Sequence, residues 1–202
     1  MSEKTITLIV ARHGKAQHNL GSEKEHRFAG NRVDTSLALE GIDDAKLLAH
    51  KIQKMGGCDL IISSTLKRSR ETAEIIAKKL GMKATSSISE LSEINIGDFA
   101  GHTEDEVKKL FPEEAKTFYD GDVINWHFPN GEDYNQVTKR LAIALQKIKK
   151  IANPRQRVLV VGHGMINCIL FHQFLPDRID LWQERSYPHD RLVEIKYKWE
   201  GK

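Results

Sequence analysis

The chain has 202 residues, of which 40% are hydrophobic and 29% charged, and its formal net charge is +3 at pH 7. This length suits one domain that buries a full core, and the composition excludes disordered and fibrous chains. The small net charge does not indicate a nucleic-acid partner, and no apolar stretch is long enough for a membrane span. We therefore expect one domain over residues 1–202, with no nucleic-acid or membrane partner.

The chain contains two cysteines, Cys58 and Cys168. Their spacing indicates neither a zinc site nor a disulfide framework. The N-terminal apolar run is too short for a signal peptide. These features are typical of a soluble protein from a reducing compartment, so we expect a cytoplasmic location. A single buried disulfide is the alternative.

Apolar, β-branched runs alternate with segments of helical periodicity along most of the chain. The expected strands cover residues 5–11, 58–64, 83–89, 157–161 and 191–197, and the third of them is weak. The expected helices cover residues 36–55, 66–81, 132–152 and 165–175. Thr35 or Ser36 should cap the first helix, and Gly81 should end the second. This alternation predicts a three-layer α/β/α sandwich around a mostly parallel sheet.

Residues 90–131 break the alternation. They are rich in glycine, acidic and aromatic residues, and they contain one short helical stretch at 103–111 that Pro112 should end. We expect an insertion of loops and short helices here, lying over the active site. Trp126, His127 and Phe128 are expected to pack locally rather than line a substrate mouth.

Arginines and histidines follow several of the expected strands. Arg12 and His13 come directly after the first strand, His163 directly follows the strand at 157–161, and Arg68 lies shortly after the second strand. Ligands bind at the carboxyl ends of the strands in such sheets, so we expect these four side chains to converge there. Arginine forks match the oxygens of phosphate or carboxylate. The pattern predicts an oxyanion site, with phosphoryl transfer as the leading chemistry.

Small residues accompany the two histidines. Gly14 and Gly164 permit a tight turn and a close approach of the backbone to a ligand. Gly164 also opens a helix whose free N–H groups favour an anion. Asn19 adds a neutral donor to the site, or it simply caps a turn.

Phosphoryl transfer also requires a nucleophile and an acid for the leaving group. Neutral imidazole is a competent nucleophile near pH 7. A carboxylic acid can protonate the leaving oxygen. Glu90, Glu93 and Asp98 are the candidates, and their spacing does not choose among them.

The histidines and basic residues named above also permit other interpretations. A metal site could use His13, His18 and His163, but no carboxylate or cysteine spacing supports it. His18 is otherwise an exposed loop residue. Lys67 and Arg70, which flank Arg68 in sequence, are expected to be solvated.

Six short blocks occur in a fixed order between residue 7 and about residue 170. They are RHG (12–14), DTSLALEG (34–41), SSTLKRSRETA (63–73), LSEINIGDFAG (91–101), PNGED (129–133) and VVGHGMI (160–166). Together they resemble the histidine phosphatase superfamily, the phosphoglycerate mutase-like proteins. The resemblance implies a phosphoglycerate mutase-like fold and a site that needs no metal or cofactor.

The resemblance implies a role for each matching position. His13 would be the nucleophile that becomes a phosphohistidine. Glu93 would be the proton donor and then the base for hydrolysis. The phosphoryl oxygens would be held by Arg12, Arg68 and His163, together with Asn19.

Several positions depart from the family pattern. Lys15 and Ala16 stand where the family usually has Glu or Gln followed by Thr or Ser, and Asp133 stands where Ser is usual. The segment SYPHD at 186–190 has no clear match. Lys15 is either a solvated charge or a contact for a second anionic group. These departures bear on specificity rather than on the chemical core.

True phosphoglycerate mutases carry Glu-Arg-His-Tyr-Gly and a longer basic insertion, whereas here Ile94 follows Glu93. We therefore favour metal-independent hydrolysis of small phosphomonoesters. A mutase-type phosphotransferase and a catalytically silent phospho-ligand-binding module are the alternatives. The sequence indicates neither the substrate nor an oligomeric state.

Overall fold

The computed structural model describes residues 5–21, 26–83, 86–120, 124–182 and 187–198. Its strands are β1 (Thr5–Arg12), β2 (Leu60–Ser63), β3 (Ser86–Ser87), β4 (Arg157–Gly162) and β5 (Leu192–Lys198). Its α-helices are α1 (Leu39–Lys54), α2 (Lys67–Leu80), α3 (Glu104–Leu110), α4 (Pro112–Tyr119), α5 (Tyr134–Ile151) and α6 (Gly164–Phe174).

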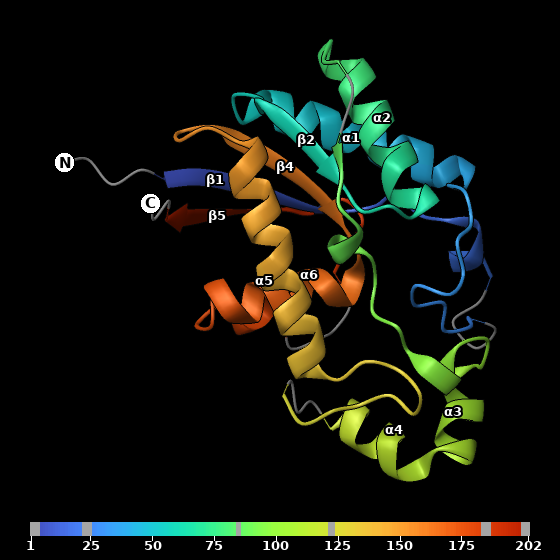
Figure 1. The fold of residues 1–202 in the computed structure, drawn as a ribbon. Coiled ribbons are helices and arrows are strands. Elements are labelled where there is room, and N and C mark those ends of the chain that lie inside the picture. The colour runs from blue at the N-terminus through green and yellow to red at the C-terminus, as the bar shows by residue number, and fades with distance from the viewer. Residues whose placement is uncertain (1–4, 22–25, 84–85, 121–123, 183–186, 199–202) are drawn as a thin grey trace.

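The strands form one sheet in the order β3-β2-β4-β1-β5. The first four run parallel, and β5 runs antiparallel along β1 (Figure 1). In the register of β1 with β4, Arg12 stands opposite Gly162. The next residues, His13 and His163, therefore leave the sheet side by side, as the strand pattern predicted.

Alternation along the strands produces two apolar layers. Ile6, Leu8 and Val10 of β1 face the layer that contains α5 and α6. Ile9 and Ala11 face α1 and α2 on the other side (Figure 1). Burial of each large aliphatic side chain contributes roughly 1.5–3 kcal/mol. The predicted α/β/α sandwich around a mostly parallel sheet is confirmed.

Two element boundaries differ from the sequence prediction, and a third agrees with it. Helix α1 begins at Leu39 with Ala38 at the N-cap and no side-chain cap, so neither Thr35 nor Ser36 stands at the capping position. The Thr35 hydroxyl bonds His18 instead. The weak strand at 83–89 reduces to the two residues of β3. Gly81 ends α2 in the left-handed conformation, as predicted.

The segment between β3 and α5 contains a helix that the sequence analysis missed. Pro112 ends the stretch at 103–111, but it also opens α4, because a proline fits the first turn of a helix. Helices α3 and α4 lie away from the sheet, beyond the carboxyl ends of its parallel strands (Figure 1). A cluster of aromatic rings packs beneath them, made of Phe28, Phe99, Phe111, Phe118 and Phe128.

Trp126 and Phe128 are both 3% exposed, with ring centroids 5.2 Å apart, and His127 is exposed. The tryptophan and the phenylalanine therefore pack locally, as expected. Both cysteines are free, which excludes the alternative of a disulfide between Cys58 and Cys168. Within the described residues, no helix is long and apolar enough to cross a membrane.

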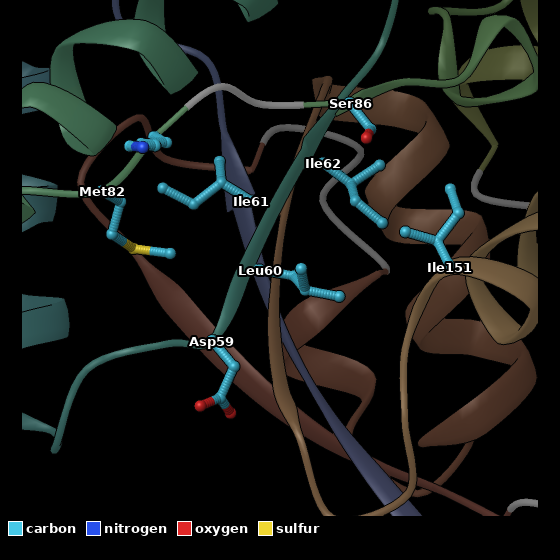
Figure 2. A pocket seen from close by; sticks show the side chains of 8 residues that line it. Asp59, Leu60, Ile61, Ile62, Met82, Ser86 and Ile151 are labelled. Carbon is cyan, nitrogen blue, oxygen red and sulfur yellow. The ribbon is translucent and has the colours of Figure 1, made fainter.

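A pocket of about 290 Å³ lies along the outer edge of β2. Figure 2 shows Leu60 and Ile62 pointing toward Ile151 of α5, whereas Ile61 points to the other face of the sheet. No residue of the predicted site lines this pocket. Its position is thus separate from the carboxyl edge where the histidines leave the sheet.

Candidate active site

His13 is 2% exposed at the end of β1. Its Nδ1 lies 2.7 Å from the carbonyl oxygen of Gly14. A carbonyl can only accept, so Nδ1 carries the ring proton. The other ring nitrogen, Nε2, accepts a hydrogen bond from Nε of Arg68 at 3.2 Å. The ring is therefore a neutral imidazole whose lone pair is on Nε2.

Burial lowers the pKa of His13 well below the ordinary histidine value. The nearby His163, Arg12 and Arg68 lower this pKa further, because a second positive charge beside them is unfavourable. His13 therefore stays unprotonated near neutral pH. A neutral imidazole is the form that can attack an electrophile.

Arg68 is 1% exposed in the first turn of α2. Its terminal nitrogens donate to the carbonyl oxygens of Val33 at 2.7 Å and Gly30 at 2.9 Å. These bonds hold the guanidinium so that Nε faces His13. The neighbouring Lys67 and Arg70 are exposed, as the sequence analysis expected.

His163 is fully buried at the end of β4. Its ring centroid lies 5.0 Å from that of His13. Its Nε2 lies 2.7 Å from the hydroxyl of Ser64, which also accepts the N–H of Leu66. Its Nδ1 is buried and has no hydrogen-bond partner among the described residues. If the Ser64 hydroxyl donates to Nε2, the proton resides on Nδ1, which is then a donor suited to an anion.

Arg12 ends β1 beside the first turn of α6. One terminal nitrogen donates to the carbonyl of Tyr187 at 2.8 Å. Its Nε is buried and has no partner among the described residues. A Cβ added at Gly164 would lie 3.5 Å from the guanidinium carbon of Arg12, so Gly164 sits directly against the guanidinium. Arg12 and His163 thus each hold a buried polar group without a partner among the described residues at the ends of two adjacent strands, which favours an oxyanion there.

Glu93 reaches the same place from the segment that follows β3. Its carboxylate accepts the backbone N–H groups of Met165 and Ile166, each at 3.2 Å, at the start of α6. It also accepts the N–H of Ile94 at 3.0 Å. A helix N-terminus stabilises a carboxylate in this position. The structure thus places the Glu93 carboxyl against the first turn of α6, whose N-cap is His163.

The other two candidate acids have different partners. Glu90 pairs with Lys147 at 2.6 Å, and this hydrogen bond lowers its pKa. Asp98 accepts the side-chain amide of Asn130 at 2.8 Å. Contacts that spacing alone could not foresee therefore distinguish Glu93 from Glu90 and Asp98.

Gly14 and Asn19 have local structural contacts. The N–H of Gly14 donates to Thr72, and a Cβ at Gly14 would lie 2.2 Å from the carbonyl oxygen of Gly41. The close approach that requires this glycine is thus to α1. Asn19 accepts the N–H of Ala16 within its own turn, and its amide nitrogen lies 3.3 Å from His26. Its role toward phosphate remains a prediction.

His18 corrects an expectation. It is half-buried, with its ring centroid 6.5 Å from that of His13 and its Nδ1 2.6 Å from the hydroxyl of Thr35. Burial and then the charge of Arg68 lower its pKa to about 3. Its burial comes from contacts with residues well separated in sequence, such as Thr35 and Arg68, so no local pattern indicates it.

His189 was missed by the sequence analysis. It precedes β5, its ring centroid lies 5.5 Å from that of His13, and its Nδ1 donates to the His13 carbonyl. Burial, followed by the charge of Arg12, lowers its pKa to about 4. His189 belongs to the segment SYPHD at 186–190, which matches no family pattern and therefore gave no indication of this contact. Ser186 lies outside the described residues.

Lys15 and Ala16 follow the strand exit. The backbone N–H of Lys15 donates to Asp44 of α1, and Ala16 is fully buried opposite Leu37. The small side chain at position 16 thus fits a packed site. Among the described residues, no group of three or more His, Cys, Asp or Glu side chains is arranged to hold a metal ion.

Comparisons with known proteins show the family of this chain. A model of the histidine phosphatase superfamily (branch 1) matches residues 8–202. Phosphoglycerate mutase-like protein 4 of Arabidopsis thaliana is 31% identical over 188 residues, which cover 93% of this chain and 74% of that protein. Fructose-2,6-bisphosphatase of Saccharomyces cerevisiae is 29% identical over 192 residues, which cover 93% of this chain and 38% of that longer protein.

Solved structures share the fold. YhfR of Bacillus stearothermophilus has a TM-score of 0.76 and 27% identity, over 94% of this chain and 90% of that chain. Phosphoglycerate mutase from Bacillus anthracis has a TM-score of 0.77 and 26% identity, over 96% of this chain and 89% of that chain. The phosphoglycerate mutase-like fold is thus confirmed. With the family model matched over nearly the whole chain, this protein belongs to the histidine phosphatase superfamily.

Proposed function

We propose that this protein hydrolyses phosphomonoesters through a phosphohistidine at His13. The observation that carries the proposal is the state of the His13 ring. Its Nδ1–H donates to the Gly14 carbonyl, so the lone pair is on Nε2, which accepts a hydrogen bond from Arg68. A binding module needs no such nucleophile, whereas covalent phosphoryl transfer does.

In the first step, Nε2 of His13 attacks phosphorus, and the bond from phosphorus to the ester oxygen breaks. Glu93 gives its proton to the departing oxygen. Charge on the transferred group would be balanced by Arg12, Arg68 and the Nδ1 proton of His163.

In the second step, water attacks the phosphohistidine. The Glu93 carboxylate takes the proton from this water, and the phosphorus–nitrogen bond breaks to restore neutral His13. Inorganic phosphate leaves. Glu93 thereby regains the proton that it gave to the alcohol, so the cycle needs no cofactor and no metal.

The relatives suggest where to look for the substrate. Two of them are described as a fructose-2,6-bisphosphatase and a mycobacterial glucosyl-3-phosphoglycerate phosphatase. Small phosphorylated sugars and sugar acids are therefore the class to screen first. A mutase-type transfer is the second candidate, because a Bacillus anthracis phosphoglycerate mutase shares the fold at 26% identity.

The test measures phosphate release from p-nitrophenyl phosphate in the presence of a chelator. We expect release that resists the chelator, is blocked by vanadate, and falls roughly 10⁴- to 10⁶-fold in His13→Ala. Acid-labile labelled phosphate should be trapped on the wild type and not on the variant. His50→Ala, at an exposed position of α1, is the control. Retained activity in His13→Ala, or transfer between phosphoglycerate hydroxyls without phosphate release, would overturn the proposal.

A further inference from the structure

The segment that carries Glu93 is held by an ion pair between Glu132, just before α5, and Arg140 of α5. Nε and one terminal nitrogen of Arg140 bind the two carboxylate oxygens of Glu132 at 2.8 and 2.9 Å. Both side chains are 19% exposed. Such a two-point fork fixes orientation as well as distance.

Arg140 uses its remaining terminal nitrogen on the segment itself. That nitrogen donates to the carbonyl oxygen of Glu90 at 2.7 Å and to that of Ser92 at 2.8 Å. Ser92 directly precedes Glu93. The guanidinium therefore fixes the backbone on the N-terminal side of the proposed acid.

Glu132 fixes the other side of the same segment. Its carboxylate accepts the backbone N–H of Asn95 at 2.8 Å, and its own N–H donates to the Asn95 carbonyl at 2.8 Å. Glu93 thus lies between two anchored points. Its own carboxylate bonds the N–H groups of Ile94, Met165 and Ile166, so the pair acts on the backbone of the segment and not on this side chain.

We propose that Arg140 and Glu132 form a positioning pair that holds the Glu93 carboxyl in register with His13 for proton transfer. The inference rests on the proposed function. Residues 92–96 belong to no helix or strand, so polar anchors rather than a backbone ladder set their position. A displacement of about 1 Å at a reacting group can cost about 100-fold in rate.

The test uses two aryl esters that differ in their need for an acid. Phenolate leaves poorly without a proton, whereas p-nitrophenolate leaves readily. In Arg140→Met, we expect kcat/KM for phenyl phosphate to fall about 10- to 100-fold. The loss of kcat/KM for p-nitrophenyl phosphate should be about one tenth as large, so the ratio of the two values changes. The ratio of the two values does not depend on how much of the variant is folded.

A matched control is present at the opposite end of the sheet. Arg157 donates to the carbonyls of Gly57 and Met55 and pairs with Glu194 at 2.7 Å. Arg157→Met removes the same kind of contacts away from the site, so its ratio should equal that of the wild type. Glu132→Gln keeps the side-chain volume and should change the ratio in the same direction as Arg140→Met, but less.

Glu93→Gln is the reference and should show the largest change in the ratio. If Glu93→Gln changes the ratio and neither variant of the pair does, the positioning role is wrong while the proposed function stands. If Glu93→Gln leaves the ratio unchanged, or the wild type releases no phosphate, the proposed acid itself fails and the positioning role fails with it.

Discussion

Two regions of the molecule build the candidate site by different means. At the sheet edge, the hydrogen-bonded register of β1 with β4 delivers His13 and His163 side by side. In the connection from β3 to α5, Glu93 lies outside helices and strands and is placed by hydrogen bonds from α6 and by the Arg140–Glu132 pair. A strand exit is fixed by the core beneath it. A connection can lose its alignment while the core stays folded.

The largest expected effect comes from removing the carboxyl of Glu93, the group that the connection from β3 to α5 supplies to the site. Glu93→Gln should lower kcat/KM roughly 10²- to 10⁴-fold for esters with poor leaving groups, because proton transfer is lost. Steady-state kinetics on phenyl phosphate and on an alkyl phosphate measure the loss. The fold should persist, as circular dichroism and thermal unfolding can show.

The rival carboxylates of the same segment are the controls. Glu90→Gln and Asp98→Asn remove partly exposed pairs with Lys147 and Asn130, so each should change the rate by no more than a few fold. A larger loss in either variant than in Glu93→Gln would reassign the acid.

A second prediction sharpens the sheet-edge side of the comparison. Ser64→Ala removes the hydroxyl beside Nε2 of His163 and frees the ring to place its proton on Nε2. We expect kcat to fall about 10- to 100-fold, since one oriented donor to the transferred group is weakened. The ¹⁵N chemical shifts of the His163 ring report the tautomer directly.

Ser63→Ala is the matched control, because Ser63 is equally buried but its hydroxyl bonds Ser87. It should cost about 1 kcal/mol of stability and leave kcat unchanged. Equal kcat in the wild type and Ser64→Ala would mean that β4 alone orients His163.

The comparison also explains what could be predicted from the sequence. Periodicity located β1, β2 and β4, and parallel topology then brought His13, Arg68 and His163 to one edge. Ser64 follows β2 at that same edge, so its place could have been inferred by the same argument. The choice of Glu93 over Glu90 came from the family resemblance, because no local pattern determines where a connection turns.

Other features could not be read from local patterns. His18 and His189 meet His13 through contacts across 5 and 176 residues of chain, made by loops without periodicity. Helix α4 was missed because Pro112 serves both as the end of one helical stretch and as the first residue of the next. The cap predicted at Thr35 or Ser36 failed because α1 starts only at Leu39, which places Ala38 at the N-cap.

The smallest predicted effect concerns stability rather than rate. Burial holds His189 neutral down to about pH 4, whereas in the unfolded chain a histidine takes up a proton below about pH 6.5. The unfolded state therefore binds more protons than the folded state between these values, and stability falls as pH falls through that window. The full stability is present above about pH 6.5.

His13, His163 and His18 act in the same direction, since burial lowers the pKa of each. His189→Asn removes one of these titrating groups. The free energy of unfolding should then fall less steeply between about pH 6.5 and about pH 5. The change is at most about 1.4 kcal/mol per pH unit, and it is reduced by solvent screening because His189 is only partly buried. Urea unfolding at several pH values measures it, with the exposed His50→Asn as control. An unchanged slope in His189→Asn would place this imidazole in water, outside the site that the sheet edge builds.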